Sequence, residues 1–502
     1  MGIENLHCIA PVQQLLKGES ITVLMYTIWC SRKDLQRAFD LATPEGQEGF
    51  VAWYKVSVLR EYGIDPESPA RFERLRREEE VLKAISRFMP ASVKKVGSRI
   101  WLRYLAREAK IISRRKSGAT LETAYGQLTA CERKKFSPPG FNLIGYAHAE
   151  LGMGEHVRMT AAALASTNIP YGVYNFDVGV SSRKSADLDH GELIDENRYN
   201  INAFHINADQ MLTAYCHLGH DFFARRYNIG YWAWELAKCP NEWLPVVEMV
   251  DEIWAPSKFI QSAFAEVTSV PVYHMPLCVA LPSFRKRDRK YFGLPENDFL
   301  FTLAFDFLSF INRKNPFAVI KAFKSAFADK RTRAGLVIKV MNGDPTSSGW
   351  SEMLSLINGD HRIHVVNQTM SRSDVLALID TTDCFVSLHR SEGFGRGPAE
   401  AMLMGKPVIV TNYSGNTDFT KRENSCLVNY QLIPVTDGDY VFAAGQVWAD
   451  PDVEHAAWWM RRLVDDSGFA REIASRGRET IATEYNQTII GEWYSRRFRD
   501  LL

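Results

Sequence analysis

The sequence predicts an α/β protein with two doubly wound parallel sheets that follow a helical extension. Two observations support this fold class. From Phe141 onwards, short apolar runs alternate with helical segments, which is typical of parallel strands joined by crossover helices. Two of the strand-to-helix junctions, at residues 151–155 and 391–397, are rich in glycine. Before residue 136 the sequence lacks such junctions, and its apolar residues follow a helical period.

The length and composition of the chain limit the class of protein. A chain of 502 residues is too long for one hydrophobic core, so two or three domains are expected. The 60 lysines and arginines nearly cancel the 59 aspartates and glutamates, which excludes the broad basic field of a nucleic-acid coat. We therefore expect no nucleic-acid partner.

Cysteine usage and hydropathy indicate a cytoplasmic protein. The eight cysteines contain no C-x-x-C pair, which favours free thiols over a disulfide framework or a zinc site. The longest apolar runs, such as that from Ile21 to Ile28, are far shorter than the roughly 20 residues that a membrane helix needs. No basic region leads into an apolar one at the N-terminus, so we expect no signal peptide.

Residues 1–135 are predicted to form the helical extension. Thr43 followed by Pro44 indicates a helix start, because threonine caps helices and proline favours the first helical position. Between Ser92 and Lys116, six basic residues recur every three or four positions and share one helical face. Apolar residues lie on the other face. This pattern fits either a helix in peripheral contact with an anionic inner membrane surface or a packing helix with a solvated basic face.

Residues 136–284 are predicted to form the first Rossmann-like domain. Its expected strands are residues 142–146, 171–176, 201–206, 229–234, 252–255 and 272–275. In open α/β sheets, ligands bind beyond the carboxyl ends of the strands. His205 and Glu235 lie at two such ends and are candidate binding residues.

Residues 285–480 are predicted to form the second Rossmann-like domain, after a charged linker from Phe284 to Arg289. Its expected strands are residues 299–305, 336–340, 363–366, 384–388 and 407–411. Arg313 and Lys314 lie between the first of these strands and the next helix, where two adjacent cations suit a pyrophosphate. Residues 481–502 are predicted to form a C-terminal helix.

The segment from Ser391 to Met402 reads as a glycine-rich turn that opens a helix. Glycines let the backbone approach a ligand closely, and the start of a helix directs N–H groups and a positive dipole at an anion. Glu392 lies in the turn and Glu400 in the first turns of the helix. The two carboxylates therefore flank a site that suits a diphosphate, where they can bind sugar hydroxyls.

Seven residues separate Glu392 from Glu400. Glu392 begins E-G-F-G, Glu400 begins E-A-M, and a G-K-P-V-I run follows from Gly405. This pattern resembles the donor site of retaining glycosyltransferases of family 4. The resemblance covers roughly residues 136–495. It implies two facing Rossmann-like domains, the GT-B fold, with a last helix that crosses back to the first domain. It also implies a nucleotide-sugar donor, a glycan or lipid-linked acceptor, and a role in bacterial surface polysaccharide synthesis.

The resemblance implies roles for individual residues. Glu392 is expected to hold the transferred sugar and Glu400 the ribose. Lys314 matches the lysine that holds the donor diphosphate, whereas Arg313 lies closer to it than the usual arginine. The remaining implied positions are Gly393, Phe394, Gly395 and Asn367 at the donor, Gly152, Gly154 and Glu235 on the acceptor side, and His205 near the donor sugar.

Several of these residues have a structural alternative. Gly152 and Gly154 also suit a tight turn that is needed only for packing, and His205 also suits a buried structural histidine. Trp232 and Trp234 are expected to share one face of a strand before Glu235, where the aromatic cluster either stacks on a sugar ring or fills a core.

The implied reaction retains the anomeric configuration, with Glu392, His205 and Lys314 as the catalytic group and no covalent nucleophile. Because fixed cations and a helix dipole can meet the charge of the leaving diphosphate, no metal or other cofactor is expected. Three D-x-D triplets are interpreted as solvated turns; they begin at Asp187, Asp437 and Asp450. The alternative function is a catalytically silent carbohydrate-binding or scaffold protein of the same fold.

Overall fold

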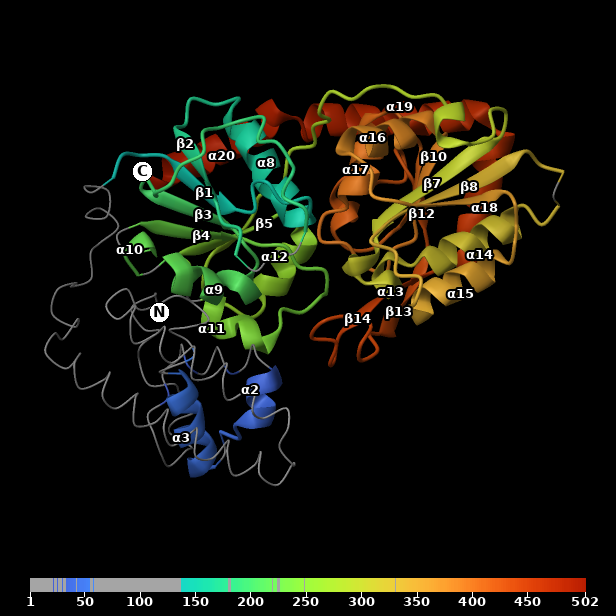
Figure 1. Ribbon diagram of the computed structural model, residues 1–502. Helices are drawn as coiled ribbons and strands as arrows, with labels where there is room; N and C mark the ends of the chain where they lie inside the picture. Colours follow the sequence, from blue (N-terminus) through green and yellow to red (C-terminus); the bar gives the residue numbers. More distant parts are fainter. Residues whose placement is uncertain are drawn as a thin grey trace, which may run out of the picture.

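The computed structural model describes residues 33–41, 43–54, 137–178, 182–218, 220–223, 226–247, 249–329 and 331–502, together with Ile21, Met25, Trp29 and Ser57. Figure 1 shows two α/β domains side by side, with the first in teal and green and the second in yellow and orange. The segment from Ser92 to Lys116 lies outside the described residues, so its membrane contact stays a prediction.

Two helices of the N-terminal extension are described, α2 (Lys33–Ala38) and α3 (Pro44–Trp53). The predicted helix start is confirmed. The Thr43 side chain accepts a hydrogen bond from the backbone N–H of Gly46 at 3.1 Å, and Pro44 occupies the first turn. The cap works because threonine offers an oxygen to an otherwise unpaired N–H group.

The first domain is one parallel sheet in the order β2-β1-β3-β4-β5-β6. Its strands are β1 (Phe141–Gly145), β2 (Tyr171–Asn175), β3 (Ile201–His205), β4 (Tyr227–Tyr231), β5 (Glu252–Ala255) and β6 (Val272–His274). Its helices are α8 (Gly152–Leu164), α9 (Ala208–Leu218), α10 (His220–Phe223), η5 (Asn241–Trp243), α11 (Leu244–Val247) and α12 (Lys258–Ala265). The strand order reverses between β1 and β3, where ligands bind in such sheets.

The second domain is also a parallel sheet, in the order β12-β11-β10-β7-β8-β9. Its strands are β7 (Phe299–Asp306), β8 (Ala334–Met341), β9 (Ile363–Asn367), β10 (Cys384–Ser387), β11 (Val408–Thr411) and β12 (Cys426–Val428). Its helices are η6 (Lys290–Phe292), η7 (Phe307–Ser309), α13 (Ile311–Lys314), α14 (Pro316–Ala326), α15 (Ser348–Ile357), α16 (Arg372–Thr381), α17 (Arg396–Leu403), η8 (Gly415–Asp418), α18 (Val453–Asp465) and α19 (Ser467–Glu484). The order reverses between β7 and β10. Two parallel, doubly wound sheets confirm the predicted fold class.

The prediction that Trp232 and Trp234 share a strand face is wrong. β4 ends at Tyr231, and the chain then leaves the sheet, where the Asn207 side chain accepts a hydrogen bond from the Ala233 N–H at 2.9 Å. Both indoles are buried in the first-domain core, and the Trp234 ring centroid lies 4.7 Å from that of Trp243. The aromatic cluster before Glu235 therefore fills a core.

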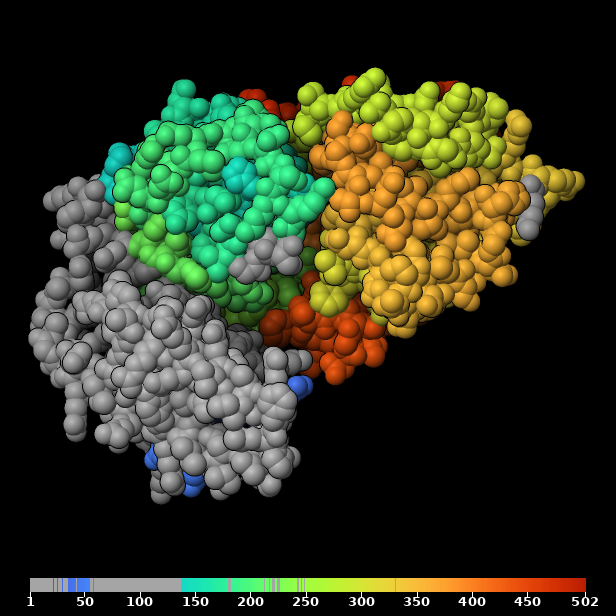
Figure 2. Space-filling view, in the orientation of Figure 1, coloured from blue at the N-terminus to red at the C-terminus, as the bar shows by residue number. Residues whose placement is uncertain are grey.

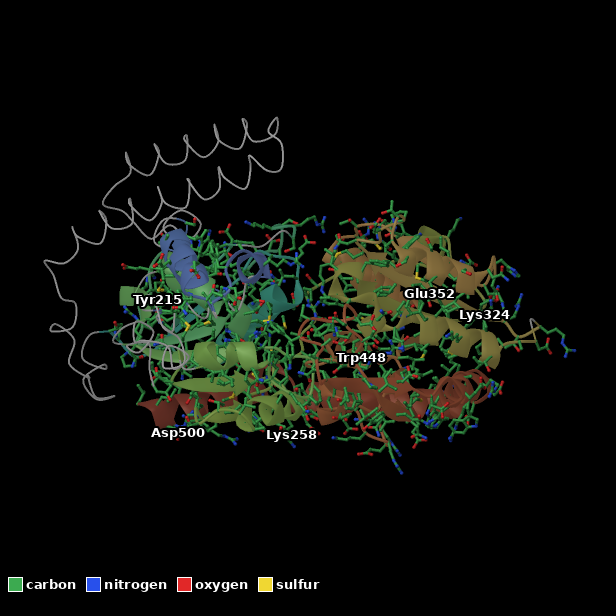
Figure 3. All side chains as sticks on the ribbon, turned by 90° about the horizontal axis from the view of Figure 1, so that it is seen from below. Tyr215, Lys258, Lys324, Glu352, Trp448 and Asp500 are labelled. Carbon is green, nitrogen blue, oxygen red and sulfur yellow. The ribbon has the colours of Figure 1, made fainter. Side chains whose placement is uncertain are left out.

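A two-stranded antiparallel hairpin, β13 (Tyr430–Pro434) and β14 (Val447–Pro451), extends from the second domain. Its loop carries buried side chains, including Tyr440, that join the core cluster of the first domain. Trp448 belongs to the same cluster and is labelled near the junction of the domains in Figure 3. The space-filling view shows the hairpin, in dark orange, beneath the line where the two domains meet (Figure 2).

The last helix, α20 (Gln487–Leu501), lies against the first domain, on the side of α8 (Figure 1). The Tyr494 ring stacks on that of Trp254 with 5.4 Å between centroids. Arg497 forms an ion pair with the buried Glu252 of β5. The C-terminal segment therefore ties the two domains together.

Candidate functional site

The site is built where the strand order of the second sheet reverses. Arg313 and Lys314 form the end of α13, after β7, and Glu392 follows β10. Between these cations and α14, Asn315 takes a left-handed conformation with φ 51° and caps α14. Its side-chain amide donates to the Leu388 carbonyl at 3.0 Å. Asparagine tolerates this conformation better than most residues, so it can fix the cation-bearing turn to the end of β10.

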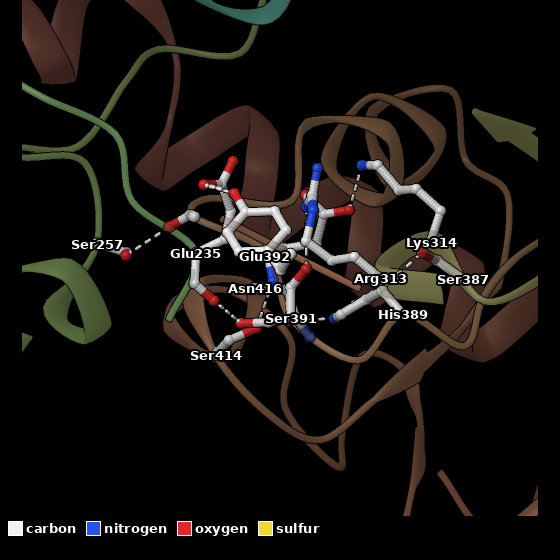
Figure 4. Close-up of polar contacts among 12 residues, drawn as sticks. Glu235, Ser257, Arg313, Lys314, Ser387, His389, Ser391, Glu392, Ser414 and Asn416 are labelled. Atoms are coloured by element: carbon white, nitrogen blue, oxygen red, sulfur yellow. Dashed lines mark hydrogen bonds and ion pairs between the residues drawn. The ribbon is translucent and has the colours of Figure 1, made fainter. Parts of the chain in front are cut away.

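The predicted residues Glu392, Lys314 and Arg313 meet in one group (Figure 4). The Lys314 ammonium donates to one oxygen of Glu392. The other oxygen lies 3.4 Å from a guanidinium nitrogen of Arg313, which also donates to the Ser391 carbonyl at 3.0 Å. The backbone N–H of Glu392 donates to Ser414 Oγ at 2.8 Å. Both carboxylate oxygens thus face fixed cations.

The charges around Glu392 decide its protonation state. Burial by itself raises the pKa of this carboxyl group, but the charges of Lys314 and Arg313 outweigh burial and lower the pKa to about 2. Burial also lowers the pKa of Lys314 from its ordinary value, against the opposing charge of Glu392. Glu392 is therefore a carboxylate at neutral pH.

The low pKa of Glu392 predicts a pH-dependent stability. Because the pKa is about 2 in the folded protein and 4.5 as the ordinary value, the stabilisation is complete above about pH 4.5 and is lost as the pH falls toward 2. We expect the unfolding free energies of the wild type and Glu392→Gln to differ by up to roughly 3 kcal/mol at pH 7 and to converge on acidification. Urea titrations from pH 7 to pH 3 measure this difference. A difference that stays constant across that range would contradict the ion pair.

His389 supports the same turn, and the sequence prediction missed it. Its Nε2 lies 2.9 Å from the side-chain oxygen of Asn416, whose amide nitrogen donates to the Thr411 carbonyl at 3.0 Å. His389 Nε2 therefore carries the proton, and Nδ1, 3.0 Å from Ser387 Oγ, accepts. Burial lowers the pKa of this imidazole, which favours the neutral form. The sequence signal that could have identified His389 is its position just after β10, because ligands bind beyond the carboxyl ends of such strands.

Glu235, predicted on the acceptor side, is a residue of the first domain that contacts the second domain twice. Its carboxylate accepts a hydrogen bond from the Tyr440 hydroxyl at 2.6 Å, and its backbone carbonyl accepts one from Ser391 Oγ. The Arg313 guanidinium carbon lies 5.7 Å from the centre of the Tyr440 ring. The hairpin loop thus brings Tyr440 to the cations, a contact that the sequence prediction did not include.

The glycine-rich turn is shaped by close contacts. A Cβ on Gly393 would lie 3.0 Å from the Trp234 carbonyl oxygen, and Gly395 has φ +94° as the residue that caps α17. Phe394 packs in the core, with its ring centroid 5.4 Å from that of Phe419. Only the backbone of Phe394 is therefore left to contact a donor.

Glu400 lies on α17 and forms an ion pair with Arg372 at the start of α16. Asn367 ends β9, and its side-chain amide donates to the Gly343 carbonyl at 3.4 Å. Gln368, the next residue, lines a cavity of about 350 Å³. The structure thus brings together Glu392, Arg313 and Lys314 but gives Glu400 different partners.

The predicted residues of the first domain divide into two groups. A Cβ on Gly154 would lie 2.2 Å from the Ala149 carbonyl oxygen, so packing requires this glycine. A Cβ on Gly152 would have no neighbour within 4 Å, so this position leaves room for a ligand. His205 is fully buried, with Nδ1 3.2 Å from that of His156, and burial lowers its pKa. This geometry favours the structural alternative for His205.

The part of the chain that the structure describes contains no group of three or more histidine, cysteine, aspartate or glutamate side chains that could hold a metal ion. Asp439, from the second D-x-D triplet, accepts a hydrogen bond from the Asn312 amide at 2.6 Å. Among the described helices, none has the length and apolar character to cross a membrane.

Comparisons with known proteins identify the fold and a family model that matches part of the chain. The family model of glycosyl transferases group 1 matches residues 307–480. HepE of Anabaena, solved in complex with UDP and glucose, is 13% identical over 72% of this chain and 100% of its own, with a TM-score of 0.52. No curated protein sequence matches the chain.

Two further solved structures share the fold. Sucrose-phosphate synthase of Thermosynechococcus elongatus is 15% identical over 72% of this chain and 99% of its own, with a TM-score of 0.51. A glycosyltransferase of Rickettsia africae is 12% identical over 72% of this chain and 99% of its own, with a TM-score of 0.52. The chain therefore has the GT-B fold of glycosyltransferases, and the greater part of its second domain matches the glycosyl transferases group 1.

Proposed function

We propose that this protein is a retaining hexosyltransferase of family 4, which moves a sugar from a nucleotide-sugar donor to a glycan or lipid-linked acceptor of a bacterial surface polysaccharide. The observation that carries the proposal is the group of Glu392, Lys314 and Arg313 at the reversal point of the second sheet. It stands beside the glycine-rich start of α17, where a diphosphate meets both fixed cations and N–H groups. The UDP and glucose bound to HepE, on the same fold, support this donor class.

Each residue of the group has a role in the proposed reaction. Lys314 and Arg313 meet the charge that develops on the leaving diphosphate, so the step needs no metal. Glu392 accepts hydrogen bonds from hydroxyl groups of the transferred sugar. Both oxygens of Glu392 face cations, so Glu392 is poorly placed to attack the sugar as a nucleophile. This supports direct attack by the acceptor hydroxyl on the anomeric carbon, from the same face that the diphosphate leaves. Glu400 binds the ribose.

A thermal-shift panel of UDP, GDP, ADP and their sugar conjugates tests the proposal. A ligand that binds only the folded protein at 100 times its Kd stabilises it by about 2.7 kcal/mol, so one base is expected to raise Tm by several degrees. Lys314→Met should remove most of the shift. Lys321→Met, a change of an exposed lysine on α14, should leave it unchanged. No shift with any nucleotide would favour the silent scaffold.

A further inference from the structure

Five charged side chains from both domains, with Glu400 among them, meet where the domains contact each other. Arg158 donates to Glu155 Oε2 at 2.8 and 3.1 Å within α8. Arg396, the first residue of α17, lies 3.3 Å from Glu155 Oε1 and 3.6 Å from Glu400 Oε1. Arg372 completes the cluster through its ion pair with Glu400. Arg396 is thus the residue that joins the two domains in this cluster.

The members of the cluster differ in exposure. The side chains of Glu155 and Glu400 are 9% and 4% exposed, whereas that of Arg396 is 40% exposed. Each carboxylate also has a second arginine, Arg158 for Glu155 and Arg372 for Glu400. Arg396 can therefore leave the cluster while each buried carboxylate keeps a cationic partner, so neither is left as a costly unpaired charge.

The surroundings of Arg396 favour an anion. Arg396 begins α17 and lies 3.3 Å from Glu155 in the first turn of α8, so the positive ends of two helix dipoles lie there. Three arginines against two glutamates leave this cluster with an excess of one positive charge. The open space at Gly152 lies in the first turn of α8, three residues before Glu155.

We propose that Arg396 exchanges partners during donor binding: it pairs with Glu155 before the donor binds and with the donor diphosphate afterwards. Glu155 then competes with the donor for one guanidinium. Arg396 acts as a specificity residue that favours nucleoside diphosphates over monophosphates. This inference rests on the proposed function and adds a third cation to Lys314 and Arg313.

Four forms of the full-length protein test the exchange: wild type, Arg396→Gln, Glu155→Gln and the double variant. Calorimetry measures the affinity of each form for UDP and UMP, for GDP and GMP, and for ADP and AMP. We expect Arg396→Gln to weaken diphosphate binding about tenfold and monophosphate binding less than threefold, because it removes one charge-assisted contact. Glu155→Gln should strengthen diphosphate binding, and this gain should vanish in the Arg396→Gln background because the two residues are coupled.

The controls separate this inference from the proposed function. Arg422→Gln removes an exposed arginine elsewhere and should leave the affinities unchanged, and Arg396→Lys should retain part of the diphosphate preference. Circular dichroism shows whether each variant folds. The exchange is overturned if both single variants bind the diphosphate more weakly than the wild type. It is also overturned if Glu155→Gln raises the diphosphate affinity equally with and without Arg396. Neither result affects the proposed function. A wild type that binds none of the three diphosphates overturns the proposed function as well.

Discussion

Replacing Glu392 with glutamine is expected to lower kcat by at least about 100-fold, the cost of removing one preorganised polar group from a reaction site. The amide keeps the size of the side chain but loses the charge that Lys314 and Arg313 face. The sugar then loses an acceptor for its hydroxyl groups, and the two cations lose the carboxylate that orients them. Release of the nucleoside diphosphate in the presence of acceptor measures kcat.

The control for this experiment is Glu423→Gln, which neutralises an exposed carboxylate in the same domain and should leave kcat unchanged. The Glu392→Gln protein should still melt cooperatively, because the fold does not depend on one ion pair. Full transferase activity in a folded Glu392→Gln variant would refute the proposed mechanism.

Replacing Arg497 with alanine is expected to lower the free energy of unfolding by about 3 kcal/mol, as breaking a buried ion pair does. Glu252 is fully buried, and Arg497 is its cationic partner. The Trp254 indole and the Tyr227 hydroxyl also donate to this carboxylate, at 2.6 and 3.0 Å, and keep it from losing all its partners. Calorimetric melting measures the effect.

Arg496 offers a matched control one position earlier on α20. It is exposed and lies 3.7 Å from the exposed Glu492, so Arg496→Ala should change stability by less than about 1 kcal/mol. Because α20 returns from the second domain to the first, Arg497→Ala should also separate the melting of the two domains. Equal melting curves for both variants would show that the Glu252 ion pair contributes nothing to the fold.

Much of the fold was predictable from local pattern. Alternating apolar runs and helical segments predicted two parallel sheets, because each strand buried on both faces reads as a short apolar run. Strand ends were predicted less accurately: β4 begins two residues before the predicted start and ends three residues before the predicted end. The strand ends early because the Asn207 side chain accepts a hydrogen bond from the Ala233 N–H. The hydrophobic period of the sequence does not reveal this contact.

The candidate site was predictable only in part. The resemblance implied that the cations after β7 and the carboxylate after β10 belong to one donor site. The sheet order, in which β7 and β10 are neighbours with their carboxyl ends at the same edge, came only from the structure. The Tyr440 contact was not predictable, because it depends on a hairpin loop that reaches the core of the other domain. His205 was assigned a role from a resemblance, whereas its burial against His156 is a tertiary fact.

By itself, the sequence determined the fold class and the cap at Thr43, because hydrophobic period and capping chemistry act over short stretches. Only the tertiary structure decided which groups surround Glu392. Tyr440 lies 205 residues from Glu235, and Arg396 contacts Glu155 of the other domain. Such contacts depend on how two sheets and a hairpin pack, and packing is a property of the whole chain rather than of any segment.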